Sequence, residues 1–334
     1  MGHSLLNQFQ GSLLGISLGL FSRWITDDIP PAQAVISHSQ SLSSITVPYP
    51  PLSLISSWTN SLITQQNINW EDWQQIWQTH HHLLYNPGEP STESSPQYEY
   101  LKEVAALPII LFLHENSQHL RQQLQTLSQF GQGQSFDTTL ERLAFGKIIA
   151  ELLKPEANLH QLIPNVLTQI PEETQLAEQL IQVQTLLQQQ TNNTSVISAL
   201  MPNSSGSLQF SSSLAIAIYC FLSTPNAFSV SVQRAMRICP NSSLTSAIVG
   251  ALSGTYNGLT GIPTAWQLKL RRLTQLKLDV TSKPTVTNMI PSDRQIINQA
   301  TQLFQVWAGL YSILSPNANP LTSLIVAAPL SLPD

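Results

Sequence analysis

Charged side chains are scarce in this sequence. Asp, Glu, Lys and Arg make up 10% of the 334 residues, against about 25% in an average globular chain. The 14 Lys and Arg residues form no cluster and the formal net charge is −5, so the chain offers no basic surface for nucleic acid or for an anionic membrane. We therefore expect neither of these partners.

Cysteine is scarcer still. Cys220 and Cys239 are the two cysteines of the chain, which excludes a disulfide framework, and neither has a second cysteine at a metal-binding spacing. The start of the chain has no basic region ahead of an apolar run, so no targeting signal is predicted. Together these features favour a reducing compartment, and we expect a cytoplasmic protein.

Helical periodicity is what the sequence has in abundance. Hydrophobic residues reach 42%, and between the prolines they recur with the period of an α-helix rather than alternating. The predicted helices cover Leu5 to Phe21, Leu52 to Ile63, and residues 70–85, 98–116, 117–129, 136–153, 158–169, 172–190, 211–222, 225–237 and 292–314. Residues 86–97 are rich in Pro, Ser and Glu and are predicted to form a mobile surface loop. Two short segments, Ser195 to Ala199 and Leu208 to Phe210, are strand candidates that could pair as a hairpin.

Two stretches carry small residues at a spacing of four, which places these residues along one helical face. They are Gly11, Gly15 and Gly19 in the first stretch, and Ser246, Gly250, Gly254 and Gly258 in the second. Each helical glycine costs about 1 kcal/mol relative to alanine, which indicates a gain elsewhere, such as the close approach of another backbone. We predict that these two helices are central and closely packed. One arrangement that fits both stripes is packing of the two helices against each other. Membrane-spanning faces need about 20 mainly apolar residues, which neither stretch provides.

Three segments, in this order, resemble the ADP-ribosylglycohydrolase family. The first is the stripe from Gly11 to Gly19. The second is VAALPIILFL at residues 104–113, with Pro108 in the position of the family's helix proline. The third is the glycine-rich helix from Ser246 that closes in Pro-x-x-Trp at Trp266. The resemblance implies an all-α fold: a helical domain at 1–272, a connector and C-terminal helix at 273–314 packed on the same domain, and a loose Pro-rich tail at 315–334.

The same resemblance implies hydrolysis of N- or O-glycosidic bonds to ADP-ribose by a pair of magnesium ions. The family holds these ions with carboxylates, but the matching positions here carry none. These positions are Leu20, the run Tyr49, Pro50, Pro51 and Leu52, and the run Asn241, Ser243 and Leu244. Magnesium prefers hard oxygen ligands, and little here would balance its charge. We therefore expect no catalytic residue, no metal site and no cofactor, with magnesium as the cofactor if this register is wrong. Asn241 and Ser243 can be explained as helix caps.

Two other polar clusters are candidates for metal sites. Thr26, Asp27 and Asp28 spell part of the family's early motif but follow Gly19 too closely, so they are predicted to form a turn that ends a helix. His80 and the two histidines after it point about 100° apart on a helix. They cannot all bind one ion, and they are predicted to form a solvated helix end.

Three functions remain open at this point. The first is an inactive relative of the hydrolases that acts in binding or regulation, with a protein partner or a nucleotide-like ligand in a residual cleft. The second is a hydrolase with a relocated site that uses acids from the set Asp27, Asp28, Glu71, Asp72 and Glu103. The third is a structural or assembly protein, since the family also includes a lens crystallin.

Overall fold

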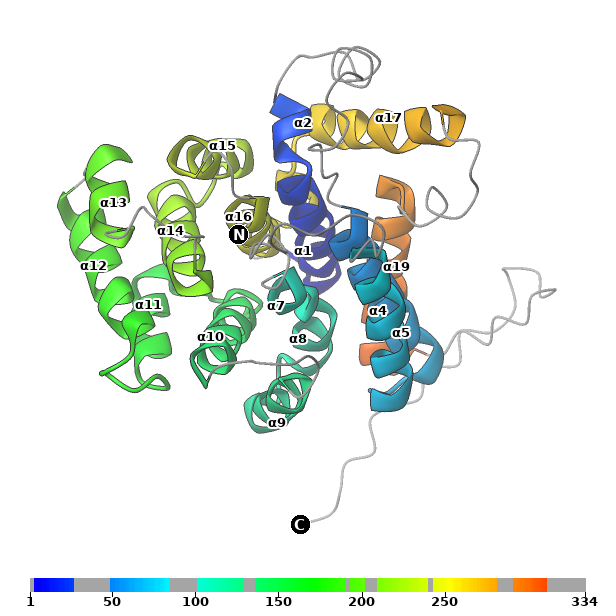
Figure 1. Ribbon diagram of the computed structural model, residues 1–334, viewed down its shortest axis with the longest axis horizontal. Helices are drawn as coiled ribbons and strands as arrows, with labels where there is room; N and C mark the ends of the chain where they lie inside the picture. The colour runs from blue at the N-terminus through cyan, green and yellow to red at the C-terminus, as the bar shows by residue number, and fades with distance from the viewer. Residues whose placement is uncertain are drawn as a thin grey trace.

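The computed structural model describes residues 3–26, 49–84, 101–128, 136–189, 193–201, 209–239, 243–280 and 291–310. Within these ranges every regular element is a helix (Figure 1). The helices are α1 (Leu5–Leu20), α2 (Ser22–Thr26), α4 (Tyr49–Gln65), α5 (Trp70–Leu84), α7 (Leu101–Ala105), α8 (Leu107–Leu113), α9 (Ser117–Leu127), α10 (Phe136–Leu152), α11 (Leu159–Leu167), α12 (Gln175–Gln189), α13 (Asn193–Leu200), α14 (Phe210–Ser223), α15 (Phe228–Ile238), α16 (Ser243–Asn257), the short 3-10 helix η1 (Leu259–Gly261), α17 (Thr264–Val280) and α19 (Asp293–Trp307). The predicted all-α class is confirmed.

The two glycine-striped helices, α1 and α16, lie side by side at the centre of the molecule (Figure 1). A Cβ atom added to Gly15 would lie 2.1 Å from the carbonyl oxygen of Gly250. At Gly11 it would lie 2.2 Å from the carbonyl oxygen of Gly254, and at Gly19 the same distance from that of Ser246. The helices therefore run antiparallel with their backbones in contact. The predicted close packing is confirmed, and the partner of each stripe is the other stripe.

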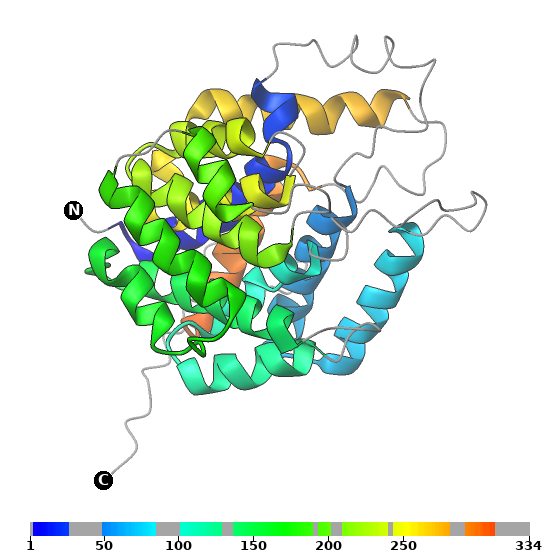
Figure 2. The same cartoon turned by 60° about the vertical axis from the view of Figure 1, so that its left-hand side comes forward.

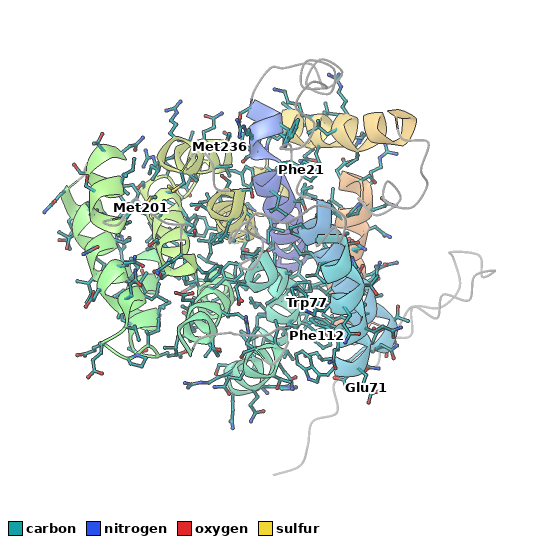
Figure 3. All side chains as sticks on the ribbon, in the orientation of Figure 1. Phe21, Glu71, Trp77, Phe112, Met201 and Met236 are labelled. Atoms are coloured by element: carbon teal, nitrogen blue, oxygen red, sulfur yellow. The ribbon has the colours of Figure 1, made fainter. Side chains whose placement is uncertain are left out.

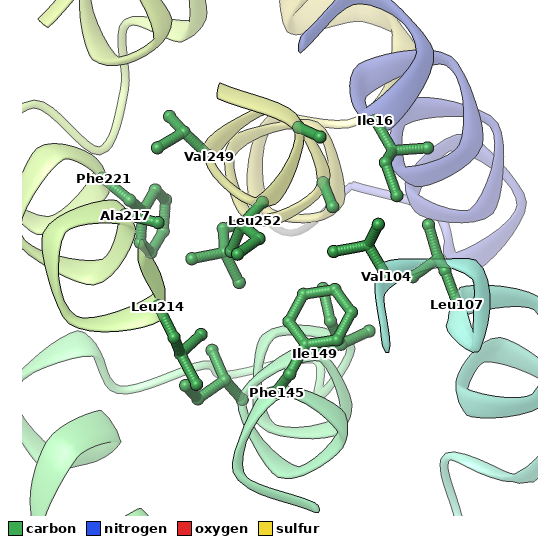
Figure 4. Close-up of a cluster of buried hydrophobic side chains, with 14 of the residues drawn as sticks. Ile16, Val104, Leu107, Phe145, Ile149, Leu214, Ala217, Phe221, Val249 and Leu252 are labelled. Atoms are coloured by element: carbon green, nitrogen blue, oxygen red, sulfur yellow. The ribbon is translucent and has the colours of Figure 1, made fainter. Parts of the chain in front are cut away.

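Apolar side chains from three further helices pack against this pair. Ile16 and Leu252 project from the central helices and meet side chains of α7, α10 and α14 (Figure 4). Among the latter, Val104, Phe145 and Leu214 have no solvent exposure. Because full burial of such side chains contributes about 1.5–3 kcal/mol each, this cluster is a main source of stability.

The C-terminal helix α19 packs on α1 and α4. Its start is held by a capping box between Ser292 and Gln295. Next to it, the buried Asp293 carboxylate accepts two hydrogen bonds from Arg271 of α17, at 3.0 and 2.6 Å. Figure 2 shows α5 on the outer side of α4. There, Trp58 and Trp73 stack with ring centroids 4.5 Å apart, and both side chains are fully buried.

Several sequence predictions need correction. The strand candidate Ser195 to Ala199 lies inside α13, where the buried Val196 and Leu200 are one helical turn apart. Phe210 begins α14 rather than ending a strand, and Leu208 lies outside the described residues. The helix predicted at 98–116 is interrupted at Ala106, since Pro108 has no N–H to continue the helical hydrogen bonds. The last helix ends at Trp307, not at residue 314.

The glutamine-rich segment was predicted to be a packed helix, and α12 confirms it with buried Leu176, Leu180 and Val183. The predicted loop at 86–97 and the tail at 315–334 lie outside the described residues. In the ranges that are described, no helix is both long enough and apolar enough to cross a membrane.

Candidate functional site

The C-terminal end of α1 lies beside the N-terminal end of α16. A Cβ atom added to Gly19 would lie 2.6 Å from the Cα of Ala247. Leu20 therefore sits at the same end of the helix pair as Ser243 and Leu244, the first two residues of α16. Two of the three segments to which the resemblance assigned a metal site are thus brought together.

The third segment is the start of α4. Helix α7 contacts both α4 and α16, and its Val104 and Ala105 are fully buried. Pro51 and Leu52 in the first turn of α4 are also buried. The side chains of Tyr49 and Pro50, and all of Asn241, lie outside the described residues.

Three of the family positions at these helix ends carry buried leucines. The exposed fractions are 2% for Leu20, 1% for Leu52 and 2% for Leu244. Met236 of α15 adds a thioether at the same end of the molecule (Figure 3), where its Sδ lies 3.6 Å from the Thr26 hydroxyl. Magnesium requires oxygen ligands in a near-octahedral shell, and none of these leucines offers one. The described residues at the family positions do not fit magnesium.

The acids proposed for a relocated site have different interaction partners in the structure. Glu103 of α7 has no solvent exposure and forms an ion pair with Arg142 of α10. Nη1 of Arg142 also donates to the Leu124 carbonyl at 3.0 Å. Asp72 accepts a hydrogen bond from the Ser61 hydroxyl. Glu71 points to solvent at the start of α5 (Figure 3).

Asp27 and Asp28 lie outside the described residues, directly after the end of α2 at Thr26. Among the residues that the structure does describe, no three His, Cys, Asp or Glu side chains are grouped as a metal site would need.

His80 corrects the prediction of a solvated histidine run. Its exposed fraction is 4%, and its Nδ1 lies 2.8 Å from the Ile76 carbonyl one turn earlier. Its Nε2 is buried without a hydrogen-bond partner in the described part of the chain. The helix face of Trp73 and Ile76 continues to His80, which explains why this histidine points inward.

Neither cysteine is suited to nucleophilic chemistry. Burial raises the pKa of the Cys220 thiol far above its usual range. Burial likewise raises the pKa of the Cys239 thiol to about 11, although a hydrogen bond with Thr245 partly offsets this rise. Since the thiolate is the reactive form, both thiols are unreactive at neutral pH.

Sequence reasoning did not identify the buried pair of Glu103 and Arg142. These two residues are far apart in the sequence, and each stands beside another charged residue, Lys102 and Glu141 respectively. Arg142 shares one helical face with the buried Phe145 and Ile149, three and seven positions later. A charged residue on such an apolar face is the signal that could have drawn attention to it.

Comparison with known proteins agrees with this geometry. A protein-family model described as ADP-ribosylglycohydrolase matches residues 47–300. No curated protein matches the chain. Helix α1 precedes the matched range, but its glycine stripe is fitted to α16, which lies within it. Because the match spans most of the 334 residues, the chain belongs to the ADP-ribosylglycohydrolase family.

Proposed function

We propose that this chain is a catalytically inactive member of the family that acts in binding or regulation. The observation that carries the proposal is the burial of Leu20, Leu52 and Leu244 at the positions that the resemblance assigns to the metal site. A leucine packed into the core stabilises the fold and leaves no oxygen atom for a cation. Under this proposal no magnesium cofactor is needed.

Electrostatics supports the same conclusion. Two magnesium ions carry about four positive charges, and such charges in a protein interior need anionic ligands to replace their hydration. The described side chains at the family positions of the two helix ends are those of Leu20, Ser243 and Leu244, with one hydroxyl among these three. A hydroxyl cannot balance that charge.

A relocated hydrolase site finds less support. Glu103 would have to give up Arg142 to act as a base, and removing one partner of a buried pair typically costs about 3–5 kcal/mol. The Asp72 carboxylate is likewise engaged by Ser61.

Isothermal titration of the chain with ADP-ribose, with and without magnesium, tests the proposal. We expect no binding that depends on magnesium. Micromolar affinity that is lost when the metal is chelated would contradict the proposal, since it requires ligands that the proposal says are missing.

A hydrolysis assay provides a second test. ADP-ribosylated arginine and serine peptides are incubated with the protein, and free ADP-ribose is measured. We expect release at the rate of buffer alone. The double variant Asn241→Asp with Ser243→Asp tests the register, because it returns two carboxylates to the start of α16, where the helix dipole favours them. We expect this variant to gain weak binding of Mn²⁺, measured by water relaxation, and the wild type to show none.

A further inference from the structure

A pocket of about 730 Å³ lies among α11, α12, α13, α14 and α15, the helices at the left of Figure 1. Sites for small molecules have volumes of about 300–1,000 Å³ and combine apolar walls with a few polar groups. Nothing in the family comparison assigns a role to this pocket.

The pocket is separate from the metal-site positions. Pro225 lines it, and the Pro225 carbonyl accepts a hydrogen bond of 2.7 Å from Asn257. Asn257 is the last residue of α16 and Ser243 is the first. A helix of 15 residues is about 22 Å long. The pocket at Pro225 and the metal-site position Ser243 therefore lie at opposite ends of α16.

Arg234 of α15 gives the pocket its charge. Its side chain is partly buried at the lining, and within the described residues it forms no ion pair and donates no hydrogen bond. By contrast, the buried Arg142 and the partly buried Arg271 are each paired with a carboxylate. No Asp or Glu is found among the described lining residues, so no carboxylate of the described part of the chain faces Arg234 across the pocket.

The rest of the lining is divided between apolar groups and other polar groups. Leu159, Ile163, Leu187 and Leu222 provide apolar walls from three different helices. The Gln184 and Asn193 amides and the His160 ring also line the pocket. A ligand that fills this space must therefore have an apolar body and carry an anionic group at one end.

We infer that this pocket binds a small carboxylate with an apolar body. A guanidinium matches a carboxylate with two parallel hydrogen bonds, and a single arginine balances a single negative charge. A pyrophosphate such as that of ADP-ribose brings two charges to the same arginine. The site therefore differs in ligand class from the hydrolase site of the family, and it does not depend on whether the chain is catalytically inactive.

Naphthoate and its uncharged analogue naphthamide are suitable probes, because they differ only in the anionic group. We expect naphthoate to bind, measured by isothermal titration and by saturation-transfer NMR, and naphthamide to bind more weakly. Replacing Arg234→Gln should weaken naphthoate binding about tenfold or more, as expected for loss of a charge-assisted hydrogen bond. ADP-ribose should not compete.

Arg237→Gln is the matched control. Arg237 is exposed, lies on the same helix and does not line the pocket, so this variant makes the same change in net charge. We expect its naphthoate affinity to stay within twofold of wild type. A second variant, Leu187→Trp, fills the pocket and leaves Arg234 in place, and it should abolish binding while circular dichroism stays that of the wild type.

Three results would overturn the inference. They are the absence of naphthoate binding up to about 1 mM, equal affinity for naphthoate and naphthamide, and equal loss of affinity in the Arg234 and Arg237 variants. Thermal unfolding of the Arg234 variant should match wild type, because the side chain has no partner to lose in the described part of the chain.

Discussion

The ion pair of Glu103 and Arg142 places two charges inside the core. Both side chains have no solvent exposure, and Arg142 gains a second partner in the Leu124 carbonyl. Such a pair need not stabilise the fold more than apolar residues would, but breaking it leaves an uncompensated charge. The pair therefore holds α7 against α10 and cannot be removed one partner at a time.

Replacing Glu103→Gln should lower the free energy of unfolding by about 3–5 kcal/mol, because the buried Arg142 guanidinium loses the carboxylate that it contacts. Urea unfolding followed by circular dichroism measures the change. Glu115→Gln removes a carboxylate from an exposed position, and it should change the free energy by less than about 0.5 kcal/mol. Equal effects of the two variants would show that the buried pair has no special role.

His114 makes stability depend on pH. Burial lowers the pKa of His114 from its ordinary value of 6.5, although a hydrogen bond with Leu111 and the charge of Glu115 raise it. The imidazole packs against the rings of Phe9 and Trp307, at centroid distances of 5.7 and 5.0 Å. The His114 imidazole is therefore protonated less readily in the folded chain than in the unfolded chain.

By linkage, the contribution of His114 is fully present above pH 6.5 and is lost as the pH falls below this value. We expect the free energy of unfolding of the wild type to fall more steeply on acidification than that of the His114→Gln variant. Urea unfolding at a series of pH values gives the difference. If the two proteins lose stability in parallel, His114 does not titrate as described.

At the scale of elements, the glycine stripes could be predicted from the sequence, whereas their pairing could be named only as one arrangement. A spacing of four defines one helical face, whereas the identity of the partner depends on contacts between residues more than 200 positions apart. The strand candidate failed for a related reason. Val196 and Ile197 are β-branched, but Val196 and Leu200 share the buried face of α13, and tertiary burial outweighed local propensity.

Replacing Gly15→Ala should force α1 and α16 apart, because the added Cβ would lie 2.1 Å from the Gly250 carbonyl oxygen. We expect the free energy of unfolding to fall by about 1–3 kcal/mol or more, as for other overpacked cores. Differential scanning calorimetry would show this as a lower Tm.

Gly146→Ala is the matched control, since Gly146 also lies inside a helix. A Cβ atom there would meet Leu124 Cδ1 at 2.9 Å, the end of a side chain that can move. The gain of about 1 kcal/mol in helix propensity should offset that shift and leave the Tm near that of wild type. A Gly15 variant as stable as the Gly146 variant would contradict the backbone contact.

At the scale of the whole molecule, the resemblance names positions for a candidate site, whereas the pocket could not be predicted from the sequence. Leu20 and Leu244 were assigned by resemblance, and the fold places them at one end of a helix pair. The pocket instead draws Arg234, Tyr219 and Leu187 from three helices. A lone arginine on a helix does not reveal in the sequence that it faces a cavity.

The stability of the whole chain with and without a metal ion tests whether the fold still contains a metal site. A ligand that binds only the folded state raises the free energy of unfolding by RT ln(1 + [L]/Kd). If the leucines at the helix ends have replaced a metal site with core packing, neither magnesium nor a chelator can shift that equilibrium. We expect the same Tm in 5 mM EDTA and in 5 mM MgCl₂. This magnesium concentration is about 1,000-fold above a Kd of about 5 μM, at which a bound ion would stabilise the fold by about 4 kcal/mol. A Tm that is several degrees higher in magnesium would show that oxygen ligands are supplied by other parts of the chain, and the assignment of an inactive site would fail.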